Sequence, residues 1–391
     1  MENYDFNKYI DRKNSDCVKY DALKQFYGRD DLIPLWVADM DFETPDFIID
    51  AIKKRLEHPI LGYLSIQDGY YQSIIDWCAK IHNWDIKKEW ISYIPGIVKG
   101  VGLVLQAFTK PGDKVIIQPP VYHPFRIVPE LNKREIVWNN LIFENGEYKM
   151  DFKQLESIIT PDCKVLILCN PHNPAGIVWD KETLIQLAKI CKKHNILVIS
   201  DEIHSEMVHK GFKHTSFATS CKEAAENSVT FMAPSKTFNI PGIVSSYSIV
   251  PSDTIREKFY SFLEANEFGD STIFAVTATI AAYEKGEAWR TQMMEYVEEN
   301  ISFVNDYISN NIKEIKCFIP QASYLMWLDC RGLNLNHDEL IDLFVDKAHL
   351  ALNDGTMFGP GGEDFMRMNL GAPRVILEKA LKQLKDAVSG L

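Results

Sequence analysis

The sequence predicts an α/β protein with a mostly parallel sheet in its larger part and a smaller α+β part. Short, nearly continuous apolar runs alternate with helical patterns between residues 90 and 290. Such runs are typical of strands in a parallel sheet that helices cover on both faces. After about residue 290 this alternation ends, which indicates a second, smaller unit.

Six apolar runs between residues 110 and 250 are the strand candidates of the larger part. They are KVIIQ, REIVW, KVLILC, ILVIS, SVTFMA and VSSYSIV. Between two of them, four apolar residues recur at helical spacing, with Asp180 placed to cap the helix. These four are Leu184, Leu187, Ala188 and Cys191. Ahead of all six, SYIPGIVKGVGLVLQAF indicates a strand, a glycine turn and a helix.

The smaller part is predicted from the end of the chain. A long polar helix pattern over 287–312 leads to EIKCFI and SYLMWLD, and then to a last amphipathic helix. The stretch up to Pro45 has little periodicity, and we expect it to pack against this part. We therefore expect a large domain over 46–286 and a small domain built from 1–45 and 287–391.

Composition and charge limit the possible partners. The formal net charge is −12 without any basic run, which argues against a nucleic-acid partner and an anionic membrane surface. The polar start MENYDFNKYIDRKNSD lacks the apolar core of a signal peptide, and no apolar stretch is long enough to span a bilayer. The eight cysteines show no CxxC spacing and indicate reduced thiols. We expect a cytoplasmic protein with no nucleic-acid or membrane partner.

Polar side chains follow three of the predicted strands. NPHNPAG comes after KVLILC, DEIH after ILVIS, and PSKTFN after SVTFMA. Open parallel sheets bind ligands beyond the carboxyl ends of their strands, so one rim gathers Asn173, Asp201, His204 and Lys236. The amides of Gly96, Ile97 and Val98 face an anion at the start of the helix that follows them.

This set of groups suits pyridoxal 5′-phosphate. A lysine can bond covalently to its aldehyde, and helix N-terminal amides can hold its phosphate. A buried carboxylate keeps the pyridine nitrogen protonated, so that the ring withdraws electrons from a substrate carbanion. An amide and an imidazole can hold the ring hydroxyl. The sequence alone therefore predicts this cofactor.

The same motifs resemble those of a known family. NPHNPAG, SDEIH, APSKTFN and FMRMNLGAPR resemble the signatures of fold-type I pyridoxal-phosphate enzymes. The spacing agrees, with 28 residues from Asn173 to Asp201 and 35 from Asp201 to Lys236. PLWVADMDF, LGYLSIQDGYY and PPVYHPF are similar to the branch of MalY/PatB-type cystathionine β-lyases. The resemblance runs from about residue 30 to the C-terminus and implies a mostly parallel seven-stranded sheet.

The resemblance implies a role for each rim residue. Lys236 holds the cofactor and serves as acid and base at the substrate Cα. Asp201 pairs with the pyridine nitrogen, and Asn173 and His204 approach the ring hydroxyl. Tyr122, from PVYHPF, stacks on the ring and completes the catalytic set.

Further roles concern the phosphate and the substrate. Gly96, Ile97 and Val98 bind the phosphate through their amides, with Ser235 beside them. Tyr63, from GYLS, reaches the phosphate from a neighbouring subunit, which implies a homodimer with shared active sites. Arg367 clamps the α-carboxylate of an amino-acid substrate bidentately. Asp39, in WVADMDF, lines the substrate pocket or forms a structural turn.

Two departures from the aminotransferase pattern favour the lyase branch. His204 stands where relatives of aspartate aminotransferase have tyrosine, and Val244 stands where they have a phosphate-binding arginine. The predicted reaction is therefore β-cleavage of L-cystathionine or a related cysteine S-conjugate to a thiol, pyruvate and ammonia. An aminotransferase needs the same cofactor residues and is the alternative. A binding protein that has lost turnover is disfavoured because the full site set is present.

The three histidines of SDEIHSEMVHKGFKH raise the question of a metal site. His204, His209 and His214 are spaced by five residues, which places them on no single helical face and matches no zinc motif. The sequence therefore predicts no metal. His204 belongs to the aspartate site, and His209 and His214 are expected to be exposed loop residues.

Overall fold

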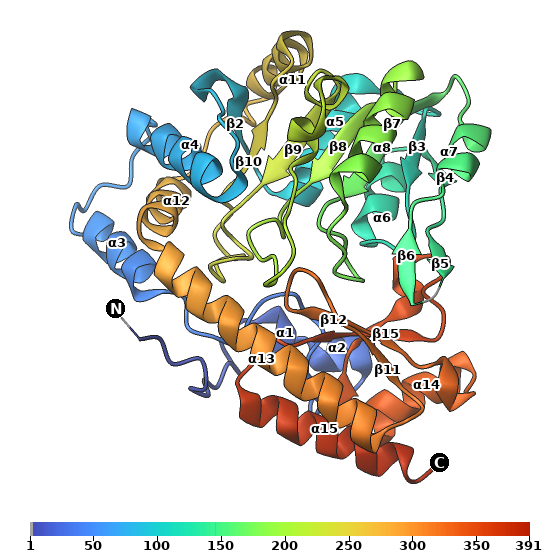
Figure 1. Cartoon of the computed structure of the whole chain (residues 1–391). Helices are drawn as coiled ribbons and strands as arrows, with labels where there is room; N and C mark the ends of the chain where they lie inside the picture. The colour runs from blue at the N-terminus through green and yellow to red at the C-terminus, as the bar shows by residue number, and fades with distance from the viewer. Residues whose placement is uncertain (1–2, 145) are drawn as a thin grey trace.

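A seven-stranded sheet lies in the upper half of the molecule and a four-stranded sheet in the lower half (Figure 1). The computed structural model describes residues 3–144 and 146–391. The long helix α13 (Glu287–Asn311) leads from the upper half and runs across the lower sheet (Figure 1). Residues from both ends of the chain surround the lower sheet (Figure 1). The limits at residues 45 and 286 stay a prediction.

The larger sheet is mostly parallel, which confirms the predicted fold class. Its strand order is β2-β10-β9-β8-β7-β3-β4, and only β10 runs antiparallel to its neighbours. Every predicted apolar run overlaps one of these strands, with β7 beginning one residue before its run and β8 ending one residue after its run. In spatial order they are β2 Ile91–Ile94, β10 Ser246–Ile249, β9 Ser228–Met232, β8 Leu197–Asp201, β7 Cys163–Cys169, β3 Lys114–Ile117 and β4 Glu135–Trp138.

Helices cover both faces of this sheet. In β7, Val165 and Ile167 belong to one buried cluster with helix α5 (Ile97–Phe108), while Leu166 belongs to another with α8 (Lys181–Lys193). This alternation follows from the two-residue period of a strand. The predicted cap of α8 is confirmed, since the Asp180 carboxylate accepts from the Thr183 amide at 2.6 Å.

The remaining helices of the upper half connect the strands or flank the sheet. They are α3 Asp46–Leu56, α4 Asp68–His82, α6 Pro124–Leu131, α7 Phe152–Ile158, α9 Phe217–Ser220, α10 Lys222–Ala225, α11 Asp253–Ala265 and α12 Ile273–Lys285. A hairpin of β5 (Ile142–Glu144) and β6 (Glu147–Lys149) extends from the edge strand β4 toward the lower sheet (Figure 1).

The smaller sheet is antiparallel, in the order β11-β12-β15-β14. Its strands are β11 Lys316–Phe318, β12 Leu325–Asp329, β15 Phe365–Asn369 and β14 Asn353–Asp354. The helices around it are α1 Val18–Asp21, α2 Leu23–Tyr27, α13, α14 His337–Asp342 and α15 Arg374–Val388. Near the start of the chain, β1 (Ile33–Pro34) pairs in parallel with β13 (Leu350–Ala351), so distant parts of the chain meet here.

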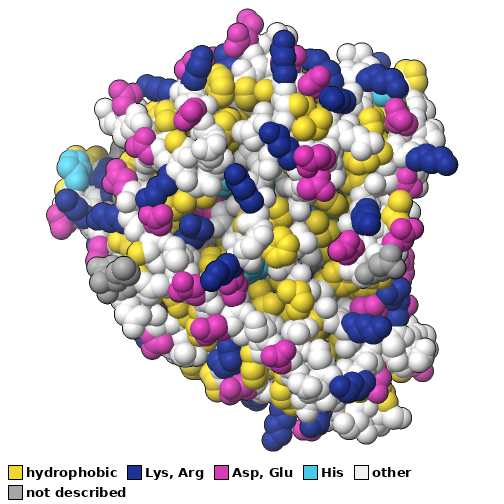
Figure 2. Space-filling model, viewed as in Figure 1, with side chains coloured by type: hydrophobic (Ala, Val, Ile, Leu, Met, Phe, Trp, Pro, Cys, Tyr) yellow, Lys and Arg dark blue, Asp and Glu magenta, His cyan; other side chains and the backbone are white. Residues whose placement is uncertain are grey.

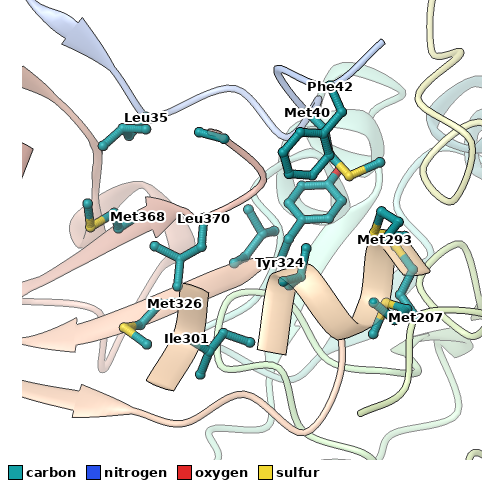
Figure 3. Close-up of a cluster of buried hydrophobic side chains, with 14 of the residues drawn as sticks. Leu35, Met40, Phe42, Met207, Met293, Ile301, Tyr324, Met326, Met368 and Leu370 are labelled. Carbon is teal, nitrogen blue, oxygen red and sulfur yellow. The ribbon is translucent and has the colours of Figure 1, made fainter. Parts of the chain in front are cut away.

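A buried apolar cluster fixes the segment after β1 onto the smaller sheet (Figure 3). Leu35, Met40 and Phe42 come from that segment and are at most 5% exposed. Met326 of β12 and Met368 of β15 lie in the same cluster. Because this cluster holds the 35–42 segment in place, the segment can serve as a fixed wall at the edge of the larger sheet.

Basic and acidic side chains are interspersed over the face shown in Figure 2. Neither sign gathers into a broad patch on that face, so it offers no extended cationic surface for a polyanion. Within residues 3–144 and 146–391, no helix combines the length and the apolar character needed to cross a membrane.

Candidate active site

The predicted rim exists at the carboxyl ends of the central strands. Cys169 at the end of β7 pairs in register with Asp201 at the end of β8, and Asp201 pairs with Phe231 of β9. The chain after β7 supplies Asn173, and the chain after β9 supplies Lys236. Strand order and register therefore bring these sequence-distant groups to one level of the sheet.

These groups line a single cavity of about 320 Å³. Nine predicted site residues line it: Gly96, Ile97, Val98, Tyr122, Asn173, Asp201, His204, Ser235 and Lys236. A cavity of this volume lies within the range of small-molecule sites. Arg367, Asp39 and Tyr63 are not among its lining residues.

One end of the cavity is formed by the start of α5. Gly96 precedes this helix with φ of 111°, a conformation that favours glycine, and no side chain caps the helix. The first amides of the helix therefore keep their hydrogen-bonding capacity for an anion. The same cavity is also lined by Ser235, Ser245 and Val244. Val244 occupies the position where relatives of aspartate aminotransferase have a phosphate-binding arginine, and the two serines supply neutral hydroxyl groups instead.

Asp201 is a deeply buried carboxyl group. Burial raises its pKa to about 7, while the Ile203 amide, which donates to Oδ1 at 3.1 Å, and the charge of Lys236 oppose that rise. A protonated ring nitrogen next to this carboxyl would favour its ionised form. The electrostatics of Asp201 therefore suit a cationic partner inside the cavity.

Lys236 is a partly buried residue of the cavity wall. Burial lowers its pKa to about 8; the charge of Asp39 opposes this change, and the charge of Arg367 adds to it. Nζ donates to the carbonyl oxygen of Ala38 at 2.5 Å. A lysine with a pKa near neutral supplies a substantial fraction of free amine, which a nucleophile or general base requires.

His204 is buried and neutral. Burial, followed by the charges of Lys236 and Arg367, lowers its pKa to about 3. Its Nδ1 is buried and lacks a hydrogen-bond partner among the described residues. A buried unpaired ring nitrogen is costly, so a ligand atom that pairs with it would stabilise the site.

Arg367 connects the two sheets. From β15 it donates to Asn173 Oδ1 at 2.9 Å, to the Trp36 carbonyl oxygen at 3.0 Å and to Asn353 Oδ1 at 2.5 Å. Burial lowers its pKa to about 10. Asn173 also lines the cavity, so Arg367 lies directly behind one of its walls.

Asp39 and Tyr63 lie outside the cavity wall. The Asp39 carboxylate accepts two bonds from Arg12, at 2.7 and 3.1 Å, and lies 3.6 Å from Lys19 Nζ. This engagement supports the alternative of a structural turn. The Tyr63 side chain is fully exposed and is not among the residues that line the cavity.

The expectation that His209 and His214 are exposed is wrong. They are 6% and 9% exposed. His209 Nε2 lies 2.6 Å from the Ser323 carbonyl oxygen, and His214 Nε2 lies 2.9 Å from Glu202 Oε2. These contacts hold both rings inside the folded loop, so both side chains have structural roles. Across the described chain, no three histidine, cysteine or acidic side chains gather to hold a metal ion.

Sequence reasoning missed several residues of the site. Ala38, Cys169 and Ser246 line the cavity, and the Tyr324 hydroxyl donates to the Ala38 carbonyl at 2.8 Å beside Lys236. Ala38 contributes its backbone carbonyl oxygen, which every residue type has, so the sequence does not indicate this role. Cys169 could have been found, because it is the last residue of a predicted strand at the rim.

The donor set fits pyridoxal 5′-phosphate. The cavity combines amides at a helix start, a lysine, a buried carboxyl group and the aromatic ring of Tyr122. The unpaired Nδ1 of His204 remains available for a ring substituent. Each functional group of the cofactor therefore has a chemically matched partner.

Comparison with known proteins agrees with this fit. Residues 30–384 match the family model described as aminotransferase class I and II. The chain is 41% identical to cystathionine β-lyase PatB of Bacillus subtilis, with 98% of this chain and all of PatB covered. It superposes with TM-score 0.96 on cystalysin of Treponema denticola, which contains pyridoxal 5′-phosphate, at 34% identity and full coverage of both chains. A pyridoxal-phosphate-bound protein from Clostridium difficile 630 matches at 43% identity and TM-score 0.96, over 99% of this chain and all of that one.

The fold and the site together define an enzyme of the fold-type I pyridoxal-phosphate class. Within that class, the chain belongs to the class I and II aminotransferase family.

Proposed function

We propose that this protein is a pyridoxal-phosphate-dependent carbon–sulfur β-lyase. Its substrates are L-cystathionine or related cysteine S-conjugates, which it converts with water to a thiol, pyruvate and ammonia. The observation that carries the proposal is that His204 lines the cavity beside Lys236, Asp201 and Asn173, at the position where relatives of aspartate aminotransferase have tyrosine. PatB, described as a cystathionine β-lyase, matches 98% of this chain and supports the reaction type.

Each part of the cofactor has a proposed holder in this chain. The amides after Gly96 hold the phosphate together with Ser235, and Asp201 holds the ring nitrogen. Tyr122 lies against the ring, and His204 and Asn173 hold the ring hydroxyl. When bound, the cofactor supplies an electron-withdrawing ring that stabilises negative charge at the substrate Cα.

The chain's own residues move the proton and orient the substrate. Lys236, whose pKa is near 8, takes the proton from Cα as a general base. Arg367 binds the α-carboxylate, which requires it to exchange one of its present amide or carbonyl acceptors for the substrate. Arg367 is buried and Lys236 is partly buried, which limits the access of water and strengthens these electrostatic contacts.

The functional unit we propose is a cytoplasmic homodimer with shared active sites. Ile60, Leu61 and Tyr63 project from an extended segment and are 67%, 56% and 110% exposed. Exposed apolar side chains in one segment are typical of an interface, and Tyr63 is the residue proposed to reach the partner's phosphate site. All eight cysteines are free, which supports a reducing compartment.

A paired assay tests the reaction type. Purified, cofactor-loaded protein receives L-cystathionine while thiol and pyruvate are followed, and in parallel receives amino donors with 2-oxoglutarate while glutamate is followed. Equal amounts of thiol and pyruvate without glutamate are expected. Glutamate without thiol would replace the lyase with an aminotransferase and leave the cofactor site intact.

A further inference from the structure

Tyr324 is a buried side chain close to the reactive lysine. It directly precedes β12 and is 1% exposed, within the apolar cluster that also holds Met40 and Phe42 (Figure 3). A buried tyrosine usually needs a hydrogen-bond partner for its hydroxyl group. Here the hydroxyl donates to the carbonyl oxygen of Ala38 at 2.8 Å. The polar end of this side chain is therefore directed at the 35–42 segment.

The carbonyl oxygen of Ala38 accepts from two donors. Besides the Tyr324 hydroxyl, Lys236 Nζ donates to it at 2.5 Å. A backbone carbonyl oxygen has two lone pairs, so both donors can bind at the same time. Because Tyr324 occupies one lone pair, the amine is left with the direction of the other. The tyrosine hydroxyl therefore limits where Lys236 Nζ can lie.

The backbone on either side of this carbonyl group is held in place. From β15, Asn369 Nδ2 donates to the carbonyl oxygens of Val37 and Asp39, at 2.6 Å each. Asn239, three residues after the reactive lysine, accepts from the Met40 amide and donates to the Met40 carbonyl oxygen, both at 2.9 Å. The shared oxygen is therefore a fixed point, and the two groups that donate to it must adjust to each other.

We propose that Tyr324 is a positioning residue, which holds the free amine of Lys236 for proton transfer at the substrate Cα through the shared Ala38 oxygen. This inference rests on the proposed function and deepens it, because it gives the smaller sheet control over the general base. Tyr324 is not among the residues that line the cavity, whereas Ala38 is. Two donors on one oxygen compete, so the hydroxyl also weakens the bond that would stabilise the ammonium form of Lys236.

Charged groups act on the same amine and stay unchanged when the hydroxyl is removed. Burial lowers the pKa of Lys236 to about 8. The charges of Asp39 and Asp201 oppose this change, and the charge of Arg367 adds to it. Tyr324→Phe leaves all three charges in place. A shift in pH dependence in this variant would therefore report on the shared carbonyl oxygen.

Exchange of the Cα proton of L-alanine in heavy water tests the inference. Alanine has no leaving group at Cβ, so its exchange needs only the cofactor and a base, in a lyase and in an aminotransferase alike. Lys236 takes the Cα proton, exchanges it with solvent and returns a deuteron to Cα. Proton NMR of the cofactor-loaded protein with alanine gives the maximal exchange rate and the half-saturating alanine concentration. Thiol release from L-cystathionine is followed with the same proteins.

Tyr324→Phe keeps the buried ring and removes only the donor. Its maximal exchange rate is expected to fall about tenfold, at an unchanged half-saturating alanine concentration. The acidic limb of the rate against pH is expected to move to higher pH, because the ammonium form of Lys236 then makes a stronger bond to Ala38. Tyr260→Phe is the matched control, since the Tyr260 hydroxyl donates to the Trp90 carbonyl oxygen at 2.5 Å. The control should change none of these quantities, and both variants should keep the absorbance band of bound cofactor.

Three outcomes overturn the inference. An unchanged exchange rate in Tyr324→Phe does so, as does an equal loss of rate in Tyr260→Phe. A loss of rate with an unmoved acidic limb also does so, because it would indicate a packing role.

Failure of the lyase proposal is distinguishable from failure of this inference. If alanine exchanges but no thiol is released, the lyase proposal fails, and the exchange rates still decide the role of Tyr324. If thiol is released without alanine exchange, kcat for thiol release and its pH profile decide instead. Wild-type protein that does neither would overturn both proposals.

Discussion

Lys236 Nζ donates to the carbonyl oxygen of Ala38, a residue 198 positions away in sequence, at 2.5 Å. The Tyr324 hydroxyl donates to the same oxygen from the direction of the smaller sheet. The reactive lysine is therefore oriented by a backbone atom of the N-terminal segment. A lysine bonded to the cofactor would give up this contact, and a lysine released by substrate could regain it.

Replacement of the lysine should abolish turnover and leave the fold intact. Lys236→Ala removes the covalent holder and the general base, so thiol release should fall by at least about 10²-fold. The absorbance band of covalently bound cofactor should disappear. Lys110→Ala, an exposed lysine after α5, should keep both properties. Full activity of the Lys236→Ala protein would contradict the site assignment.

Asp201 should make the cofactor-free protein less stable as pH rises. Its folded pKa of about 7 lies above the unfolded value of 3.8, so the folded state binds more protons between these values. Stability from this group is fully present below pH 4 and is lost toward pH 7, by up to about 4 kcal/mol. Urea unfolding of wild type and Asp201→Asn at several pH values measures the difference. An identical pH slope in both proteins would contradict the burial argument.

The fork geometry of Arg367 should matter more than its charge. Arg367→Lys keeps a cation but cannot make two parallel bonds to a carboxylate, so kcat/KM should fall by at least about 30-fold, mainly through KM. Arg331→Gln, a half-exposed arginine on the same small-sheet side, is the control. An unchanged KM in Arg367→Lys would place the α-carboxylate elsewhere.

Subunit mixing should reveal whether Tyr63 serves the partner's site. Tyr63→Ala is expected to be weakly active and Lys236→Ala inactive, and their heterodimer contains one site with both residues intact. Mixing should therefore restore activity. Lys236→Ala mixed with Asp201→Ala should restore none, because both residues belong to the same subunit's site. The absence of restoration in the first mixture would exclude a shared site.

Asp39 should stabilise the folded protein through its contacts with Arg12 and Lys19. Asp39→Asn weakens the contacts with Arg12 and Lys19, so the free energy of unfolding should fall by about 1–3 kcal/mol. Its charge raises the pKa of Lys236, so without that charge the acidic limb of kcat against pH should move to lower pH. Asp41→Asn affects the same two cations and serves as the comparison for stability. A large rise in KM without loss of stability would favour substrate binding.

The sequence predicted site residues best where they directly follow a strand. Asn173, Asp201 and Lys236 could be placed because parallel strands bring their carboxyl ends to one edge. Ala38 could not, since a carbonyl oxygen acts independently of residue type. The burial of His209 and His214 was also unpredictable, because it depends on how a loop packs on Ser323 and Glu202. Periodicity within that loop carries no such tertiary information.

The pairing of β1 with β13 has a consequence for synthesis on the ribosome. The segment that carries Ala38 is made well before its partners Leu350, Ala351 and Asn369, which lie much later in the sequence. The larger sheet can assemble before then, with Asp201 and Lys236 already placed. A nascent chain can therefore hold the cofactor-binding edge well before it holds a complete substrate pocket. Premature termination before Asn369 would leave that edge uncovered.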